Sequence, residues 1–410
     1  MQILWQELRF GVRILLKKPG FILIAIVTFS LGSVMAAEFL SEANAVFPLD
    51  DILVDGQSVL ASPLTTQQDK VATAPAGNFV VQKLAEGVYA VIRQEPPGFM
   101  VDANNVFIIN EEDVIVVDAN GAPVITLQVL AALRKLTSKP VRYVINTHYH
   151  DDHIRGNQVY REAFPGVEFI AHAFAREYLP KQGAQNRKNF LEGAPGFLAE
   201  LKGFLAKDKS LLGGELKAEE RASLAADIRL AELVLSEGSI AQTILPTITV
   251  TDRMTLHRGS RVIDIRHLGS GHTAADLVVH LPQEGILITG DLVVWPVPLV
   301  GNPQSRIGEW AVTLDQLRAL RSSIIVPGHG TILRDDAYLK TLSDMFASIS
   351  KQTVAAVSRG ETLEQARKSV NLIEFQQQLA GDSPVRKLLF SNYVAVPAVA
   401  AAYEEAKARR

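Results

Sequence analysis

The feature of this sequence that most constrains its fold is a run of metal-ligating side chains at residues 148–153, HYHDDH. In extended backbone, side chains two positions apart share a face, so His148 and His150 can direct two imidazoles at one point. Asp152 and His153 then offer a carboxylate and a third imidazole to an adjacent point. This ligand set favours a borderline cation such as zinc, and the apolar strand before it predicts that the run lies on a strand-end loop.

Three more ligand candidates lie far along the chain, each beside a glycine or at the end of an apolar strand. They are His272 in GSGHTAAD, Asp291 in ILITGDLV and His329 in IIVPGHG. Neighbouring glycines allow tight turns that present a side chain at a sheet edge. These three positions therefore complete a candidate metal site with the 148–153 run.

Composition limits the chemistry further. The chain has no cysteine, which excludes thiolate ligands, disulfides and cysteine nucleophiles. Apolar residues make up 48% and charged residues 21% of the 410 residues, enough for a large buried core. Net charge is −3 without a long basic block, which argues against a nucleic-acid partner and leaves a small-molecule substrate as the expected one.

The residues between 78 and 334 predict short strands, turns and a few helices. Strands are expected at 80–84, 88–93, 106–109, 114–117, 141–145, 167–171, 261–266, 277–281, 286–289 and 324–326. Helices are expected from Pro123 and near 310–320. Residues 173–235, rich in alanine, leucine, glutamate and lysine, predict an insertion of two or three helices, and 335–410 a helical C-terminal extension.

The N-terminal residues 1–37 have the pattern of a signal peptide or membrane anchor. Arg9, Arg13, Lys17 and Lys18 precede an uncharged run over 21–37 that ends in small residues. As a helix this run would span roughly 25 Å, short of a ~30 Å hydrocarbon core, which favours a cleaved signal over an anchor; a buried N-terminal helix is the third interpretation. Either membrane interpretation predicts an exported protein, periplasmic or anchored to the outer face of the inner membrane, with membrane contact through 21–37.

Two further features belong to this N-terminal region. The stretch Trp5–Gly32 resembles the opening of an ABC-transporter permease of the macrolide-export type, and we interpret it as a targeting leader without transport function. Residues 38–77 carry scattered serine, threonine, glutamine, proline and glycine and are interpreted as a linker.

The ligand candidates, in this order and spacing, resemble the five-motif signature of the metallo-β-lactamase superfamily, with a likeness that runs from residue 78 to 334. Asp118, at the end of IVVDAN, matches the first motif, in which the aspartate braces the ligand loop. The resemblance implies an α/β fold: an αββα sandwich of two mixed sheets with helices outside and the metals at one sheet edge.

The resemblance also implies a distribution of ligands between two metals. One metal would be held by His148, His150 and His272. The other would be held by Asp152, His153 and His329, and Asp291 would bridge the two, as in the glyoxalase II-like branch. Histidine at 150, where flavodiiron relatives have an acid, disfavours an oxygen-reducing diiron centre, and the lack of cysteine departs from the class B1 β-lactamase pattern.

The expected function is a hydrolase with two zinc ions, for which iron or manganese are alternatives. A metal-bound hydroxide would attack a thioester, lactone, β-lactam or similar carbonyl, and Asp152 would orient it and carry the proton. Two other functions stay open: a mononuclear iron persulfide dioxygenase and a non-enzymatic metal-binding module. Asp151 is interpreted as an exposed carboxylate, and Tyr149 and Trp295 as either cleft-lining or packing residues.

Overall fold

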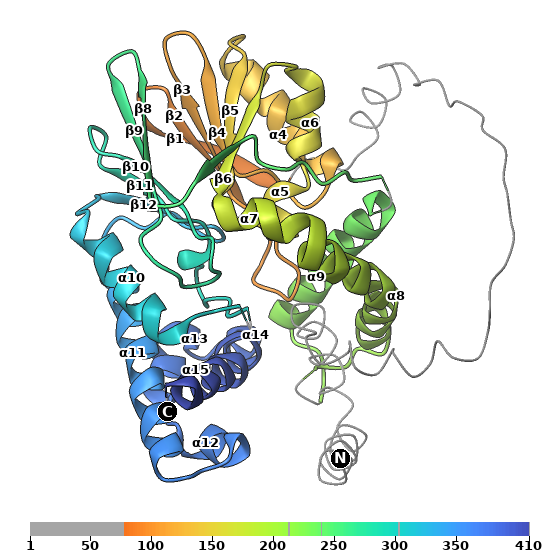
Figure 1. Cartoon of the computed structure of the whole chain (residues 1–410). Coiled ribbons are helices and arrows are strands. Elements are labelled where there is room, and N and C mark those ends of the chain that lie inside the picture. Colours follow the sequence, from red (N-terminus) through yellow and green to blue (C-terminus); the bar gives the residue numbers. More distant parts are fainter. Residues whose placement is uncertain (1–77, 212–213, 239, 302–303, 410) are drawn as a thin grey trace, which may run out of the picture.

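Two mixed β-sheets form the centre of the protein in the computed structural model, which describes residues 78–211, 214–238, 240–301 and 304–409 (Figure 1). The seven-stranded sheet has the order β1 (Phe79–Ala85), β2 (Val88–Arg93), β3 (Asn105–Ile109), β4 (Val114–Val117), β5 (Val141–Ile145), β6 (Glu168–His172) and β7 (Ile248–Val250). The five-stranded sheet has the order β12 (Ile324–Val326), β11 (Ile286–Ile288), β10 (Val278–Leu281), β9 (Arg261–Arg266) and β8 (Arg253–Arg258). Strands β4 to β7 are parallel neighbours, and so are β11 and β12.

The central strands are apolar at successive positions because both faces of the first sheet are covered. In β4, Ile115 and Val117 belong to the core between the two sheets, which Ile265 of β9 joins from the opposite side. Val114 and Val116 point the other way, into the core beneath the outer helices. Because side chains alternate between the two faces of the sheet, β4 contributes to two separate cores.

Helices cover the outer face of each sheet. On the first sheet lie α4 (Pro123–Leu136) and α6 (Asn157–Ala163), whose side chains share a core with the strands. On the second sheet lie α10 (Ile307–Ala319) and α11 (Ala337–Ser358), joined by Trp310 and Phe346 with ring centroids 4.4 Å apart. The layers are thus helices, sheet, sheet, helices (Figure 1). The αββα sandwich expected from the resemblance is confirmed.

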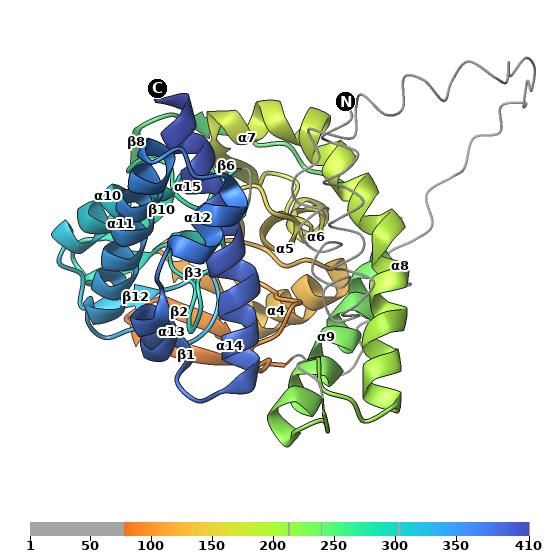
Figure 2. The same ribbon diagram turned by 90° about the horizontal axis from the view of Figure 1, so that it is seen from below.

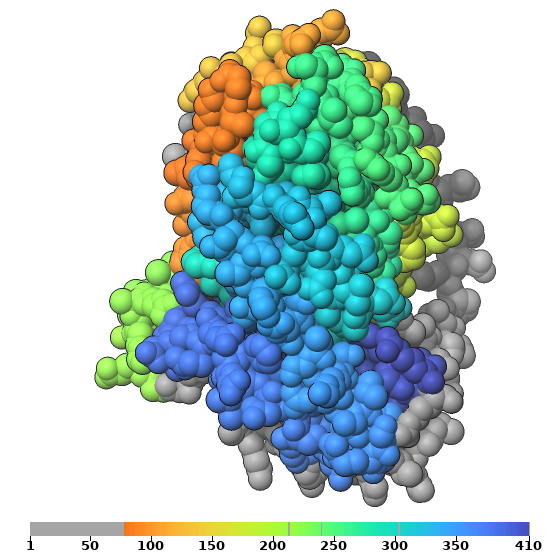
Figure 3. All heavy atoms as spheres, turned by 90° about the vertical axis from the view of Figure 1, so that its left-hand side faces the viewer, coloured from red at the N-terminus to blue at the C-terminus, as the bar shows by residue number. Residues whose placement is uncertain are grey.

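Two groups of helices extend past one end of the sheets. The first is α7 (Ala173–Tyr178), a π-helical turn η3 (Leu179–Gly183), α8 (Ala184–Ala206) and α9 (Ala218–Glu237). The second is α12 (Leu363–Ser369), α13 (Ile373–Ala380), α14 (Pro384–Phe390), the π-helical turn η5 (Ser391–Ala395) and α15 (Val396–Ala408). Seen from below, the two groups stand on opposite sides of the sheet end that carries the short helix α5 (Asp151–Ile154) (Figure 2). From the side, the C-terminal helices form a continuous surface beneath the second sheet (Figure 3).

Most predicted elements are present, with small shifts in their ends. The helix expected near 310–320 begins three residues earlier, at Ile307, and the helices predicted in 173–235 and 335–410 are observed. The strands β7 and β8 were not anticipated; β8 is the edge strand of its sheet, and none of its residues is fully buried. None of the helices in the described ranges is long and apolar enough to cross a membrane. The predictions for residues 1–37 and 38–77 fall outside those ranges.

Candidate metal centre

The ligand candidates come together because several strands end at the same edge of the sandwich. Parallel β4 and β5 end just before Asp118 and Thr147–His148, and parallel β11 and β12 end just before Asp291 and His329. His272 lies in the loop between β9 and β10. Parallel strands direct their carboxyl ends to one edge, so residues separated by much of the chain meet there.

The HYHDDH run differs from the strand-end loop expected from the sequence. His148 and His150 do follow β5, and His150 has extended backbone (φ −71°, ψ 148°). Asp152 and His153, however, lie in the helical turn α5. The turn forms because the N–H of His153 donates to the carbonyl of His150, and the His153 carbonyl in turn accepts from the N–H of Ala119. This turn directs Asp152 and His153 away from the first two histidines and toward a second point.

The first group of ligand atoms consists of His148, His150, His272 and Asp291, whose donor atoms all lie within 4.8 Å of one another. Nε2 of His272 is 2.9 Å from Nδ1 of His150. Oδ2 of Asp291 is 3.5 Å from Nε2 of His272 and 3.9 Å from Nε2 of His148. Four nitrogen and oxygen lone pairs thus converge on one point.

The second group consists of Asp152, His153 and His329. Their Oδ2 and Nε2 atoms lie 3.1 to 3.4 Å apart, and the two histidine Nε2 atoms are 3.3 Å from each other. Oδ1 of Asp291 lies 3.3 Å from Nε2 of both His153 and His329. Asp291 therefore presents one oxygen to each group, and the seven residues divide as the resemblance implied.

Three of the imidazoles are each oriented by an acceptor on the far side of the ring. His153 Nδ1 lies 2.9 Å from Asp118 Oδ2, His272 Nδ1 is 2.7 Å from the Leu299 carbonyl oxygen and His329 Nδ1 is 3.0 Å from that of Asp102. Such partners fix the tautomer that leaves the Nε2 lone pair free for a metal. His150 is turned around, since its Nε2 faces Gln304 Oε1 at 3.4 Å and its Nδ1 faces the site.

The charge states of the first ligand group suit cation binding, whereas His329 in the second group must lose a proton before it binds a cation. Burial lowers the pKa of His272 to about 3 and that of His148 well below its usual value, so both are neutral ligands at neutral pH. Burial opposes ionisation of Asp291, but the charges of His329 and His153 hold its pKa well below the usual range. For His329, burial lowers the pKa, but Asp291 and Asp152 outweigh it and raise the value to about 10.

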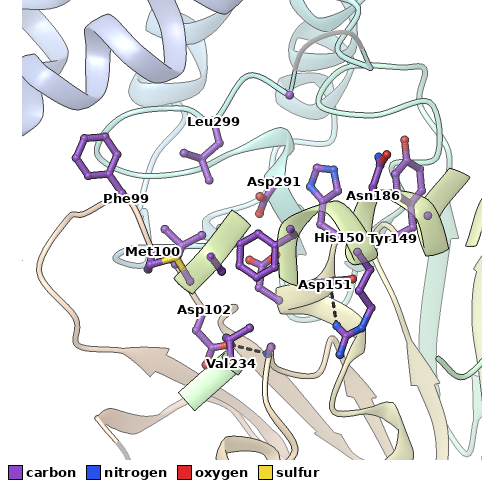
Figure 4. A pocket seen from close by; sticks show the side chains of 18 of the residues that line it. Phe99, Met100, Asp102, Tyr149, His150, Asp151, Asn186, Val234, Asp291 and Leu299 are labelled. Atoms are coloured by element: carbon purple, nitrogen blue, oxygen red, sulfur yellow. Dashed lines mark hydrogen bonds and ion pairs between the residues drawn. The ribbon is translucent and has the colours of Figure 1, made fainter. Parts of the chain in front are cut away.

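A cavity of about 570 Å³ opens beside the two groups, and His150, Asp152, His272 and Asp291 form part of its wall. The close-up shows His150 and Asp291 side by side, with Phe99 and Met100 on one side of them and Asn186 and Tyr149 on the other (Figure 4). Substrate-sized access to the ligand groups therefore exists.

The other residues singled out in the sequence have mixed outcomes. Tyr149 lines the cavity and its hydroxyl donates to Gln304. Trp295 is not among the lining residues; Arg386 lies over its ring. Asp151 belongs to neither ligand group, as expected, and its side chain is 38% exposed while it pairs with Arg155 and Arg187.

Three orienting groups were missed: the carbonyls of Asp102 and Leu299 and the amide of Gln304. Backbone carbonyls carry no residue signature, and a lone glutamine has no motif, so no sequence signal could have found them.

The chain is similar in sequence to known proteins. The family described as the Metallo-beta-lactamase superfamily matches residues 100–329. The Linear primary-alkylsulfatase of Pseudomonas sp. (strain ATCC 19151) is 25% identical over 282 residues, 67% of this chain and 50% of that protein. The chain thus spans about half the length of this curated relative.

Two solved structures also resemble the chain. A metallo-beta-lactamase from Pontibacter korlensis matches with a TM-score of 0.46 and 16% identity, over 65% of this chain and 99% of that one. The DIM-1 metallo-beta-lactamase matches with a TM-score of 0.45 and 17% identity, over 66% and 97%.

The chain belongs to the metallo-beta-lactamase superfamily, because the family match covers more than half of it and includes all seven ligand candidates. These matches give no support to the resemblance of Trp5–Gly32 to a permease, and that stretch lies outside the described residues.

Proposed function

We propose that this protein is a dinuclear metal-dependent hydrolase, with zinc as the resident ion. The observation that carries the proposal is the division of Asp291 between two ligand groups, one carboxylate oxygen toward each. A carboxylate shared in this way suits a site for two cations a few ångströms apart.

The residues present fit a pair of cations. Within the described residues, His148 Nε2, Asp152 Oδ2 and Asp291 Oδ1 are buried without a hydrogen-bond partner, and all three point into the ligand groups. A buried polar atom without a partner costs about 1–3 kcal/mol, a cost that a bound cation removes. The imidazole-rich set of nitrogen and oxygen donors favours zinc, with iron and manganese as alternatives.

A divalent cation held here would lower the pKa of a water molecule and polarise a substrate oxygen. The protein supplies the rest of the chemistry. Asp152 is a wall residue of the cavity, so the carboxylate oxygen that it does not give to a cation can orient the attacking water and hold the proton that the leaving group takes. The neutral His150 and His272 line the same side of the cavity. They leave space for the substrate carbonyl group beside Asp291.

The experiment is metal analysis of the purified protein together with a hydrolysis panel of nitrocefin, lactoylglutathione, acyl lactones and alkyl sulfates. Wild type is expected to hold two zinc ions per chain, His150→Ala and His329→Ala about one each, and Asp291→Asn fewer than two with little turnover. Two metals and full turnover in both His150→Ala and Asp291→Asn would refute the proposal.

A second candidate is the hydrolysis of a sulfate ester. The relative is named a linear primary-alkylsulfatase, and the cavity beside the ligand groups is largely apolar. Alkyl sulfates in the panel distinguish this reaction from acyl transfer. Iron content with oxygen consumption on glutathione persulfide would instead support the dioxygenase, and metal without any turnover the non-enzymatic module.

The remaining expectations are proposals of the same kind. Residues 1–37 act as an export signal or anchor and 38–77 as a linker, the catalytic domain spans 78–334 with 173–235 as an insertion, and 335–410 is a C-terminal extension. The protein then works in the periplasm or on the outer face of the inner membrane. N-terminal sequencing of the mature protein tests this, and an intact Met1 in a soluble cytoplasmic pool would exclude export.

A further inference from the structure

We infer that the substrate of this site carries an uncharged apolar chain, which lies in the cavity beside the metal ligands. The inference rests on the proposed function and names its substrate class. Away from the ligand groups most of the cavity wall is apolar, with Phe99, Met100, Ile125, Phe197, Leu230 and Val234 among the lining side chains.

The cavity is larger than the reaction itself needs. Its volume of about 570 Å³ is many times the roughly 30 Å³ that one water molecule occupies, and it is in the range of pockets that enclose a whole small molecule. Water against an apolar wall is replaced favourably by an apolar group, at roughly 0.8 kcal/mol for each buried CH₂, which is about fourfold in affinity. A substrate with several methylene groups therefore gains affinity from contact with this wall.

The wall is held in place by specific bonds. The carboxylate of Asp227 on α9 accepts from the backbone N–H groups of Phe99 (3.1 Å) and Met100 (2.8 Å). The hydroxyl of Tyr393 donates to the carbonyl of Phe99 at 2.7 Å. The loop between β2 and β3, the 173–235 insertion and the C-terminal helices thus form one preformed apolar pocket.

The positions of the polar groups indicate how the apolar chain of the substrate is oriented in the cavity. Phe99 and Met100 lie on one side of Asp291 and His150, and Asn186 and Tyr149 lie on the other (Figure 4). The one arginine among the lining residues, Arg187, is held by Asp151 at 3.0 Å, a carboxylate that it shares with Arg155. The reacting group therefore sits at Asp291, and the apolar tail extends toward Phe99 and Met100.

The test is calorimetric binding of n-alkyl sulfonates with four, six, eight and ten carbons, below their micelle concentrations, to the full zinc-loaded chain. Their carbon–sulfur bond is not hydrolysed, so binding is read without turnover. The dissociation constant is expected to fall about 16-fold for each two added carbons. A dissociation constant independent of chain length overturns the inference, and it is also the result expected if a segment of the chain itself fills the pocket.

A matched pair of substitutions on α8 locates the tail. Ala194 is buried and lines the cavity, whereas Ala199 on the same helix is exposed. Ala194→Leu is expected to weaken the ten-carbon sulfonate by about tenfold or more and the four-carbon one by less than threefold, and Ala199→Leu to change neither. Equal effects of the two variants would show that the tail binds elsewhere.

Metal content and turnover on the same preparations separate this inference from the proposed function. If the dissociation constant depends on chain length but the protein holds no zinc and hydrolyses nothing, the apolar binding site is supported and the proposed hydrolase function is refuted. If the protein holds two zinc ions and shows turnover but the dissociation constant does not depend on chain length, the hydrolase function is supported and the apolar binding site is refuted.

Discussion

Asp118 holds His153 in place: its Oδ2 atom lies 2.9 Å from Nδ1 of that histidine, and both residues are buried. Asp118 also accepts from the backbone N–H and the hydroxyl of Thr147, both at 2.8 Å. It does this from a left-handed backbone conformation (φ 59°), which is strained for most residues but tolerated by aspartate and asparagine. One side chain thus fixes the start of the ligand run and one of its imidazoles.

Asp118→Asn is expected to weaken binding at the second ligand group by 10- to 100-fold. If the asparagine oxygen stays on the Thr147 N–H, its NH₂ group faces His153 Nδ1, and the tautomer that leaves His153 Nε2 free is lost. Competition with a chelator that resolves two zinc affinities measures the effect. Asp208→Asn is the matched control, an exposed aspartate with a similar φ of 53°. Two wild-type affinities in Asp118→Asn would rule out this role.

Gly328→Ala is expected to lower turnover by about 100-fold or more and to release at least one metal. A Cβ atom at this position would lie 2.0 Å from Oδ1 of Asp291 and 2.8 Å from the carbonyl carbon of Gly290, so the shared carboxylate must move. Gly196→Ala on α8 is the control, because its Cβ would meet nothing within 4 Å and an alanine stabilises a helix interior. Wild-type metal content and turnover in Gly328→Ala would contradict the shared position of Asp291.

The free energy of unfolding is expected to fall as pH rises from about 4 to 8, in part because of Asp227. Burial raises the pKa of this carboxyl to about 7, although the N–H groups of Met100 and Phe99 oppose the shift. The unfolded chain releases the same proton near pH 3.9. The stabilisation is therefore complete below about pH 4 and is lost as pH rises through 7, by on the order of 4 kcal/mol.

Asp227→Asn isolates this contribution. Burial also raises the pKa of Asp276 to about 7, so only the difference between wild type and variant belongs to Asp227. Urea unfolding at pH 5 and pH 8 should give a smaller loss of stability in the variant, along with a cost of about 1–3 kcal/mol at both pH values for the backbone N–H left unpaired. Identical pH dependence in both proteins would exclude the buried carboxyl as its source.

Removal of metal is expected to lower the thermal midpoint by several degrees. Zinc at 100 times its dissociation constant stabilises the folded state by about 2.7 kcal/mol at each site. Without it, the Nε2 atoms of His153 and His329 face each other at 3.3 Å with buried unpartnered oxygens beside them. Calorimetry with and without a chelator measures the shift, and the His150→Ala, His329→Ala double variant is expected to show almost none. An equal shift in that variant would mean that the zinc acts elsewhere.

Much of the secondary structure and of the ligand set of this protein can be predicted from its sequence. The ligand types, their order and the glycines beside them are local properties, and so are the apolar strands and the helices of 173–235 and 335–410. Continuous apolar runs such as Val114–Val117 indicate strands buried on both faces, and the αββα arrangement then followed from the family resemblance. The edge strand β8 escaped prediction because none of its residues is fully buried and its sequence is largely polar.

The sequence by itself determined which side chains are able to bind a cation. Only the tertiary structure decided that Asp291 offers one oxygen to each ligand group, that the carbonyls of Leu299 and Asp102 orient His272 and His329, and that distant segments enclose an apolar cavity. The physical reason is that these relationships depend on where strand ends, turns and backbone carbonyls lie in space. Those positions are set by long-range pairing and packing, which no local pattern of residues encodes.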